Sequence, residues 1–121
     1  MWIVCITSVR HVLTVNGYGG RQTKENEKSW CFKGWETLVI TVGALCSNGN
    51  ISYFSQTGDK LDVVAPGVDV LSTLPNNETG LKDGTSMACP HVAGLAALIL
   101  ERNPRLTVTQ VNDIIENNTK K

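Results

Sequence analysis

The sequence predicts an α/β fold with a parallel sheet, because short apolar runs typical of buried strands alternate with segments typical of helices. Residues 38–44 are apolar on both faces of a pleated strand, as is common for a central strand covered on both sides. Residues 91–100 are apolar on every side, which is typical of a buried helix. These two runs together place a hydrophobic sheet and a hydrophobic helix in one domain.

The expected strands begin at residue 38. They are 38–44, 52–55, 61–65 and 69–73, and Asn48–Gly49 is a turn signal between the first two. Residues 16–36 show neither helical nor alternating periodicity, so we expect a loop there. Three aromatic residues lie near the end of this stretch and would be stable only against a partner or a larger core: Trp30, Phe32 and Trp35.

The residues 90–102 are predicted to form a buried helix. Gly94 lies in its middle, and we expect another backbone to approach closely there, since Ala93, Ala96 and Ala97 are also small. Pro104 prevents continuation of this helix, because its ring clashes with the preceding turn and a donor is lost.

The last helix has a recognisable start. Thr107 and Gln110 have the spacing of a capping box. One apolar stripe follows, made by Val111, Ile114 and Ile115. Lys120 and Lys121 suit its carboxyl end.

Residues 84–94, Gly-Thr-Ser-Met-Ala-Cys-Pro-His-Val-Ala-Gly, are the most informative segment. They place Ser86 at the start of a helix, where unpaired N–H groups and a partial positive charge would stabilise an oxyanion. Gly84 permits a tight turn before the serine. The segment resembles the serine motif of the subtilisin-like serine proteases.

The resemblance extends over roughly residues 38–119. It includes 39–44, 52–55, Asp-Val-Val-Ala-Pro-Gly at 62–67, 70–73, and the helix–break–helix pattern at 103–111. It implies that 38–121 are the C-terminal portion of a subtilisin-like three-layer parallel-sheet domain, which is incomplete here, whereas 1–37 are a divergent, loop-like segment without assignment. It further implies a serine-type endopeptidase with Ser86 as the nucleophile, Thr85 beside the oxyanion site, and a polypeptide substrate bordered by 74–81 and 31–35.

The other members of the family's catalytic set are absent from the sequence. The family order is Asp, His, Ser, yet no Asp-(Ser/Thr)-Gly or His-Gly-Thr-His string occurs, and the first aspartate is Asp59. The Ala-Gly-Asn string that carries the oxyanion asparagine is also missing; Asn16–Gly17 and Gly19–Gly20 do not reproduce it. We therefore expect the chain alone to be inactive, and a longer parent chain or another upstream reading frame to encode the missing strings. The alternative is a non-catalytic remnant with a structural or binding role.

Other residues near the motif have simpler interpretations. His91 follows Ser86 by five residues, so a helix turns its ring away from the serine, and a packed or capping histidine is expected. His11 has no group positioned to orient it. Asp83 is expected to interact with the helix start, Cys89 to be structural, and Thr85 to cap the helix as well as border the oxyanion site.

The charge balance does not favour several kinds of partner. The chain has 11 basic and 11 acidic residues, which does not favour nucleic acid or an anionic membrane surface. The most apolar N-terminal run, residues 2–7, is too short to cross a bilayer, and no cationic segment precedes it, so a signal peptide is not predicted, although the family is often secreted. The localisation stays open, as does the disulfide state of four cysteines: Cys5, Cys31, Cys46 and Cys89.

No cofactor or metal is expected. Members of the family often bind structural calcium, and Asp62 could contribute to a weak cation site, but a solvated carboxylate at a strand end is the expected state. A final expectation concerns packing: residues 38–44 and 91–100 each need neighbours on several sides, so a piece of this size should expose apolar surface.

Overall fold

A computed structural model describes residues 3–8, 11–17, 39–55, 57–58 and 61–119. Its main sheet has four strands in the order β1-β2-β3-β4. Their bounds are β1 Ile3–Ser8, β2 His11–Gly17, β3 Val39–Leu45 and β4 Val63–Pro66. The pair β1 and β2 is antiparallel, whereas β2, β3 and β4 run parallel to one another. The predicted α/β class with a parallel sheet is confirmed.

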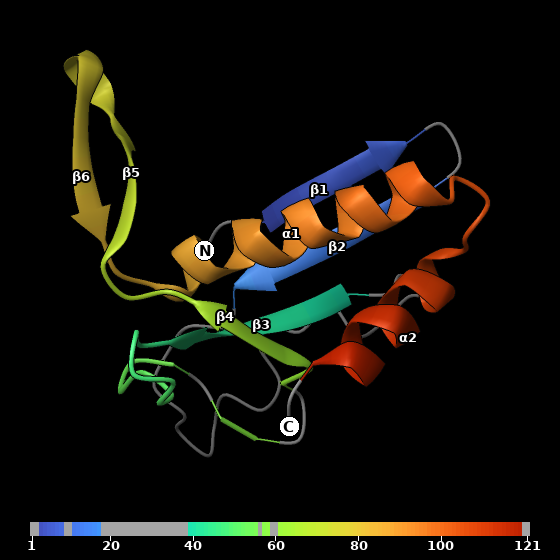
Figure 1. Cartoon of the computed structure of the whole chain (residues 1–121), viewed down its shortest axis with the longest axis horizontal. Helices are drawn as coiled ribbons and strands as arrows, with labels where there is room; N and C mark the ends of the chain where they lie inside the picture. The colour runs from blue at the N-terminus through green and yellow to red at the C-terminus, as the bar shows by residue number, and fades with distance from the viewer. Residues whose placement is uncertain (1–2, 9–10, 18–38, 56, 59–60, 120–121) are drawn as a thin grey trace, which may run out of the picture.

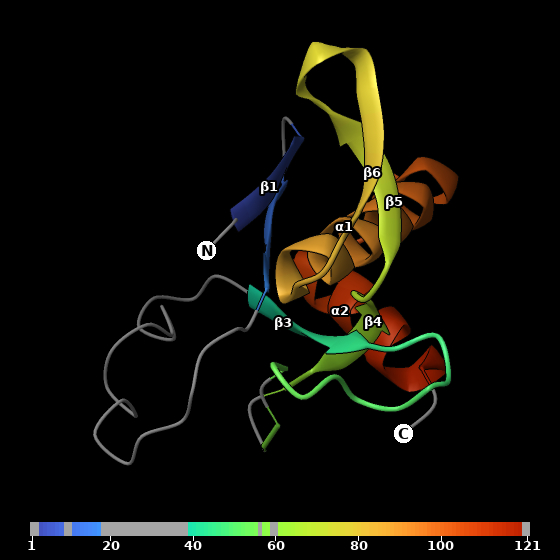
Figure 2. The ribbon, with the colours of Figure 1, turned by 90° about the vertical axis from the view of Figure 1, so that its left-hand side faces the viewer.

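Two helices and a hairpin complete the part of the fold that the structure describes. Helix α1 spans Thr85–Arg102 and lies across the sheet, in contact with all four strands (Figure 1). Helix α2 spans Val108–Asn118 and packs against α1. Strands β5 (Val70–Leu74) and β6 (Glu78–Lys82) form a separate antiparallel hairpin, and the short helix η2 (Pro75–Asn77) connects them. This hairpin projects from the rest of the structure in both views (Figures 1 and 2).

Strand β3 is buried on both of its faces. Ile40 and Val42 belong to the core that β3 and β4 share with the two helices, and both are completely buried. On the opposite face, a Cβ added to Gly43 would lie 2.9 Å from Ser55 Oγ and 3.2 Å from Leu61 Cδ1, so these two side chains cover this side. The strand predicted at 38–44 is therefore confirmed, including its double burial at the described side chains.

Several strand boundaries differ from the predictions. Residues 52–55 form a turn, closed by the Ser55 N–H donating to the Ser52 carbonyl at 2.9 Å. Aromatic residues favour strands only where they cover a half-buried surface, and Tyr53 is 99 % exposed. The expected loop at 16–36 is wrong for Asn16 and Gly17, which end β2, while 18–38 lie outside the described residues. The three aromatic residues at 30, 32 and 35, which we expected to be exposed, also lie outside the described residues.

Helix α1 is longer and less enclosed than predicted. It starts five residues before the predicted 90–102 segment and contains Pro90. One face packs into the core through Ala88, Cys89, Val92, Ala93 and Ala96. The outer face is open: Leu95 is 43 % and Leu98 63 % exposed. The prediction that this helix is buried on all sides is therefore wrong, because the described elements cover only one side of it. The expected exposure of apolar surface is confirmed.

Gly94 shows the consequence of this open face. A Cβ added there meets no described atom within 4 Å, so the expected close approach of another backbone is not found among the residues that the structure describes. We expect Gly94→Ala to raise the free energy of unfolding by about 0.5–1 kcal/mol, because alanine is a better helix former and meets no obstacle. Urea denaturation of the purified chain measures the change. A clear loss of stability would show that a further segment covers this face.

Helix α2 begins as predicted. The Thr107 N–H donates to Gln110 Oε1 at 2.9 Å and the Gln110 N–H donates to Thr107 Oγ1 at 3.3 Å, which is the complete capping box. Helix α1 ends at Arg102, before Pro104. Of the predicted stripe, Val111 and Ile115 are buried, whereas Ile114 is 36 % exposed. Lys120 and Lys121 lie outside the described residues.

Candidate active site

Ser86 is the second residue of α1 and is half-buried. Gly84 is the N-cap, with φ of 150°, a backbone conformation that residues with a Cβ rarely adopt. Its carbonyl accepts the N–H groups of Met87 (3.0 Å) and Ala88 (3.4 Å). The N–H groups of Thr85 and Ser86 have no hydrogen-bond partner within the helix. They are therefore available to bind a negatively charged group. The prediction that Ser86 begins a helix is confirmed.

The start of α1 is attached to the carboxyl ends of β3 and β4 through Gly67. The Gly84 N–H donates to the Gly67 carbonyl at 2.7 Å, and the Gly67 N–H donates to the Leu45 carbonyl at 3.0 Å. A Cβ on Gly67 would lie 2.6 Å from the Ala44 Cβ and 2.8 Å from the Gly84 carbonyl oxygen. Only glycine fits this space, so Gly67 sets the distance between the serine turn and the sheet.

We expect Gly67→Ala to lower the free energy of unfolding by about 1–3 kcal/mol, because the added methyl group cannot be accommodated without moving the backbone. Gly94→Ala is the matched control, since the same methyl group enters open space there. Chemical denaturation of both variants gives the comparison. Equal stability of the two variants would contradict the close approach at Gly67.

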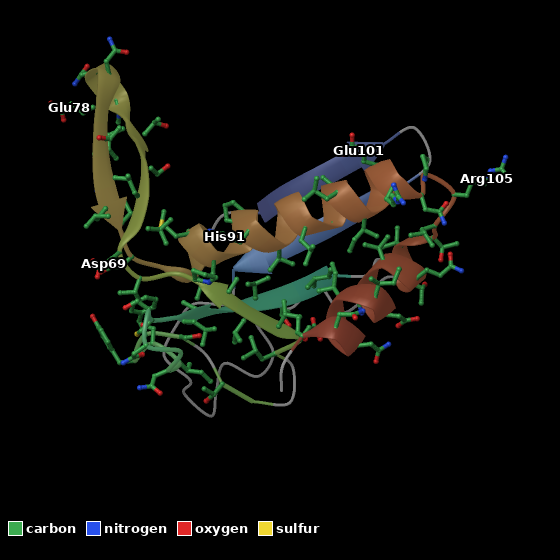
Figure 3. The ribbon with its side chains drawn as sticks, in the orientation of Figure 1. Asp69, Glu78, His91, Glu101 and Arg105 are labelled. Carbon is green, nitrogen blue, oxygen red and sulfur yellow. The ribbon has the colours of Figure 1, made fainter. Side chains whose placement is uncertain are left out.

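Asp83 closes the base of the β5–β6 hairpin. Its Oδ1 accepts the backbone N–H of Asp69 at 2.7 Å, and Asp69 has φ of 53° (Figure 3 labels Asp69). The expected interaction of Asp83 with the helix start is not what the structure shows, because the N-cap of α1 has no side-chain hydrogen bond. The carboxylate instead fixes the strand that leads into the serine turn.

The other residues near the motif have structural positions. His91 is exposed, and its Nδ1 lies 2.9 Å from the carbonyl oxygen of Met87, one turn back on the same helix (Figure 3). Of the two expected roles, packing or capping, packing is thus wrong, because the ring is exposed. Cys89 is completely buried in the core, as its structural interpretation requires, and neither Cys46 nor Cys89 forms a disulfide. Thr85 is the first helical residue, so Gly84 and not Thr85 caps the helix.

Asp62 is engaged within the fold. Its Oδ2 accepts both the backbone N–H and the hydroxyl of Thr41, each at 2.7 Å, and its own N–H donates to Thr41 Oγ1 at 3.0 Å. The expected solvated carboxylate was therefore wrong, because this side chain joins the entry of β4 to β3. The described residues contain no group of three or more His, Cys, Asp or Glu side chains that could hold a metal ion.

The described residues do not complete a catalytic triad. No histidine or carboxylate side chain among them is hydrogen-bonded to Ser86. His11 lies in β2, a strand of which only the backbone is described. The packing role of Gly67 is what sequence reasoning missed; the residue ends the 62–67 segment of the resemblance, and the Pro-Gly pair at a strand end is the signal that could have pointed to it. None of the described helices has the length and apolar character needed to span a membrane.

Comparisons with known proteins agree with the motif and the fold. The subtilase family model matches residues 10–121. Subtilisin E of Bacillus subtilis is 53 % identical over 78 residues, which are 64 % of this chain and 20 % of that protein. Subtilisin DY of Bacillus licheniformis is 55 % identical over 75 residues, or 62 % of this chain and 27 % of that protein.

The same relationship holds for solved structures. The crystal structure of a cold-adapted subtilisin-like serine proteinase superposes with a TM-score of 0.66 and 37 % identity, covering 69 % of this chain and 30 % of the other. A protease from Pseudoalteromonas arctica gives 0.66 and 35 %, covering 69 % and 29 %. The chain thus spans about a fifth to about a quarter of the length of the subtilisins it matches. Over almost its whole length, this chain belongs to the subtilase family.

Proposed function

We propose that this chain carries the nucleophilic serine of a serine-type endopeptidase. The supporting observation is the placement of Ser86 at the second position of α1, beside unpaired helix N–H groups and at the carboxyl edge of the parallel strands. Its Oγ would attack a peptide carbonyl carbon. The developing oxyanion would accept the Ser86 N–H, with Thr85 adjacent, where the helix dipole favours negative charge.

The reaction requires a base that takes the Ser86 proton and later gives it to the leaving amine. The sequence lacks the family's histidine and aspartate strings and its oxyanion asparagine. We propose that polypeptide beyond the 121 residues supplies all three, and that this chain alone is inactive. The substrate would be a polypeptide, as the peptidase family and the similar serine proteinase imply.

A chimera tests whether Ser86 can act as nucleophile. In subtilisin E, the segment that matches this chain is replaced by its counterpart here, so that the host supplies the base, the orienting acid and the asparagine. We expect peptide hydrolysis and labelling by a fluorophosphonate probe. Both should disappear in Ser86→Ala and persist in Ser72→Ala, which removes an exposed serine of β5.

A folded chimera that neither hydrolyses peptides nor takes up the probe would contradict the proposal. It would favour the alternative of a non-catalytic protein with a structural or binding role. A circular-dichroism melting curve of the chimera distinguishes that result from simple misfolding.

A further inference from the structure

The chain contains two Asn-Gly pairs, Asn16–Gly17 and Asn48–Gly49. In such a pair the backbone nitrogen of the glycine can attack the side-chain amide of the asparagine, because glycine has no Cβ to block the approach. The sequence makes the two pairs equivalent. The structure places them in very different surroundings.

Asn48 lies exposed in the turn that follows β3. Its Oδ1 accepts the Asn50 N–H at 2.9 Å. This hydrogen bond holds the Asn48 carboxamide over the Gly49 peptide unit and polarises the side-chain carbonyl of Asn48. Gly49 has φ of 83°, and a Cβ there would meet no described atom within 4 Å, so no described residue packs against this glycine and the turn is free to rearrange. One bond opposes the attack: the Gly49 N–H donates to the Cys46 carbonyl at 3.0 Å. That bond belongs to an exposed turn, where local opening costs little.

Asn16 lies within a sheet instead. Its backbone pairs with Ile3 of β1 on one side and with Thr41 of β3 on the other, and Gly17 is opposite Val42. The extended strand must leave this ladder before a five-membered ring can form between the two residues. Such opening costs far more free energy than opening of a surface turn.

We propose that Asn48 is a site of spontaneous deamidation, whereas Asn16 is protected by β2. The Gly49 nitrogen loses its proton to hydroxide and bonds to the Asn48 Cγ. The bond from Cγ to the amide nitrogen then breaks, and ammonia leaves after taking a proton from water. A water molecule opens the resulting cyclic imide at either carbonyl, which gives aspartate or isoaspartate. The net change is one water consumed and one ammonia released.

The two products differ in their effect on the fold. Both add one negative charge to a chain with a formal net charge of zero. Aspartate can still accept the Asn50 N–H. Isoaspartate adds a carbon to the main chain, which disturbs the bond from the Cys46 N–H to the Asn50 carbonyl (2.8 Å) and the bridge between Leu45 and Ile51. The connection that covers β3 is then expected to loosen.

The test is incubation of the full chain at mildly alkaline pH, in buffer and in concentrated urea, with peptide mapping by mass spectrometry over time. In buffer, Asn48 should convert at least about tenfold faster than Asn16, a ratio that corresponds to a difference of about 1.4 kcal/mol in opening. In urea, where both segments are unfolded, the difference between the two rates should largely disappear. Asn48→Gln should remove the early product and leave the slow conversion of Asn16 unchanged.

Equal conversion of both pairs in buffer would overturn the proposal, since β2 would then give no protection. Conversion of Asn48 in urea but not in buffer would also overturn it, because the turn would be shown to protect its asparagine. Isoaspartate methyltransferase labelling gives an independent readout of the product.

Discussion

The purified 121-residue chain should show no labelling by a fluorophosphonate serine-hydrolase probe above background. Without a base, a serine hydroxyl is a poor nucleophile at neutral pH. In subtilisin itself, single removals from the triad lower kcat by about 10⁴–10⁶, and the sequence here lacks the strings for two members. Loss of the oxyanion asparagine lowers kcat by about 10²–10³ there, although such effects do not add. Gel fluorescence after incubation with the probe provides the measurement.

The comparison variant is Ser86→Ala. Stoichiometric labelling that disappears in this variant would contradict the prediction and require a base within the chain, with His11 the first residue to replace. The chimera described above separates the two questions, because its labelling reports the competence of Ser86 itself.

Ile115→Ala should lower the free energy of unfolding by about 2–5 kcal/mol, the usual cost of a large cavity in a core. Ile115 is 2 % exposed and belongs to the cluster that joins α2 to α1 and the sheet. Small domains have little stability to lose, so this variant should approach complete unfolding. Urea denaturation monitored by circular dichroism measures the change.

The adjacent Ile114 provides the matched control. It is 36 % exposed and borders an open groove of about 420 Å³ between the end of α1 and α2, together with Leu98 and Leu106. Both substitutions change helix propensity equally, so their difference reports packing alone. Ile114→Ala should cost less than about 1 kcal/mol. Equal losses would mean that this face of α2 is also covered.

The sequence by itself determined the local features of the chain and its family. The segment 84–94 is enough to identify the serine motif, since the required glycine, serine and helix are contiguous. The capping box at Thr107 and the helix break at Pro104 are likewise local, because a cap or a missing N–H acts within one turn of the chain. The continuous apolar run of β3 correctly predicted that this strand is buried on both faces.

The tertiary structure decided everything that depends on contacts between distant residues. Strand β6 has no apolar alternation and exists because it pairs with β5, while Tyr53 is excluded from a strand because nothing covers it. The fit of Gly67 between Ala44 and Gly84 joins three segments, and the local Pro-Gly pair does not say which segments meet there.

The open face of α1 is the clearest case. The same apolar sequence fits a helix covered on all sides and a helix covered on one. Burial depends on which neighbouring elements are present, and the sequence of the helix does not specify those elements. Only the packing of α1 on the described strands shows that Leu95 and Leu98 face outward.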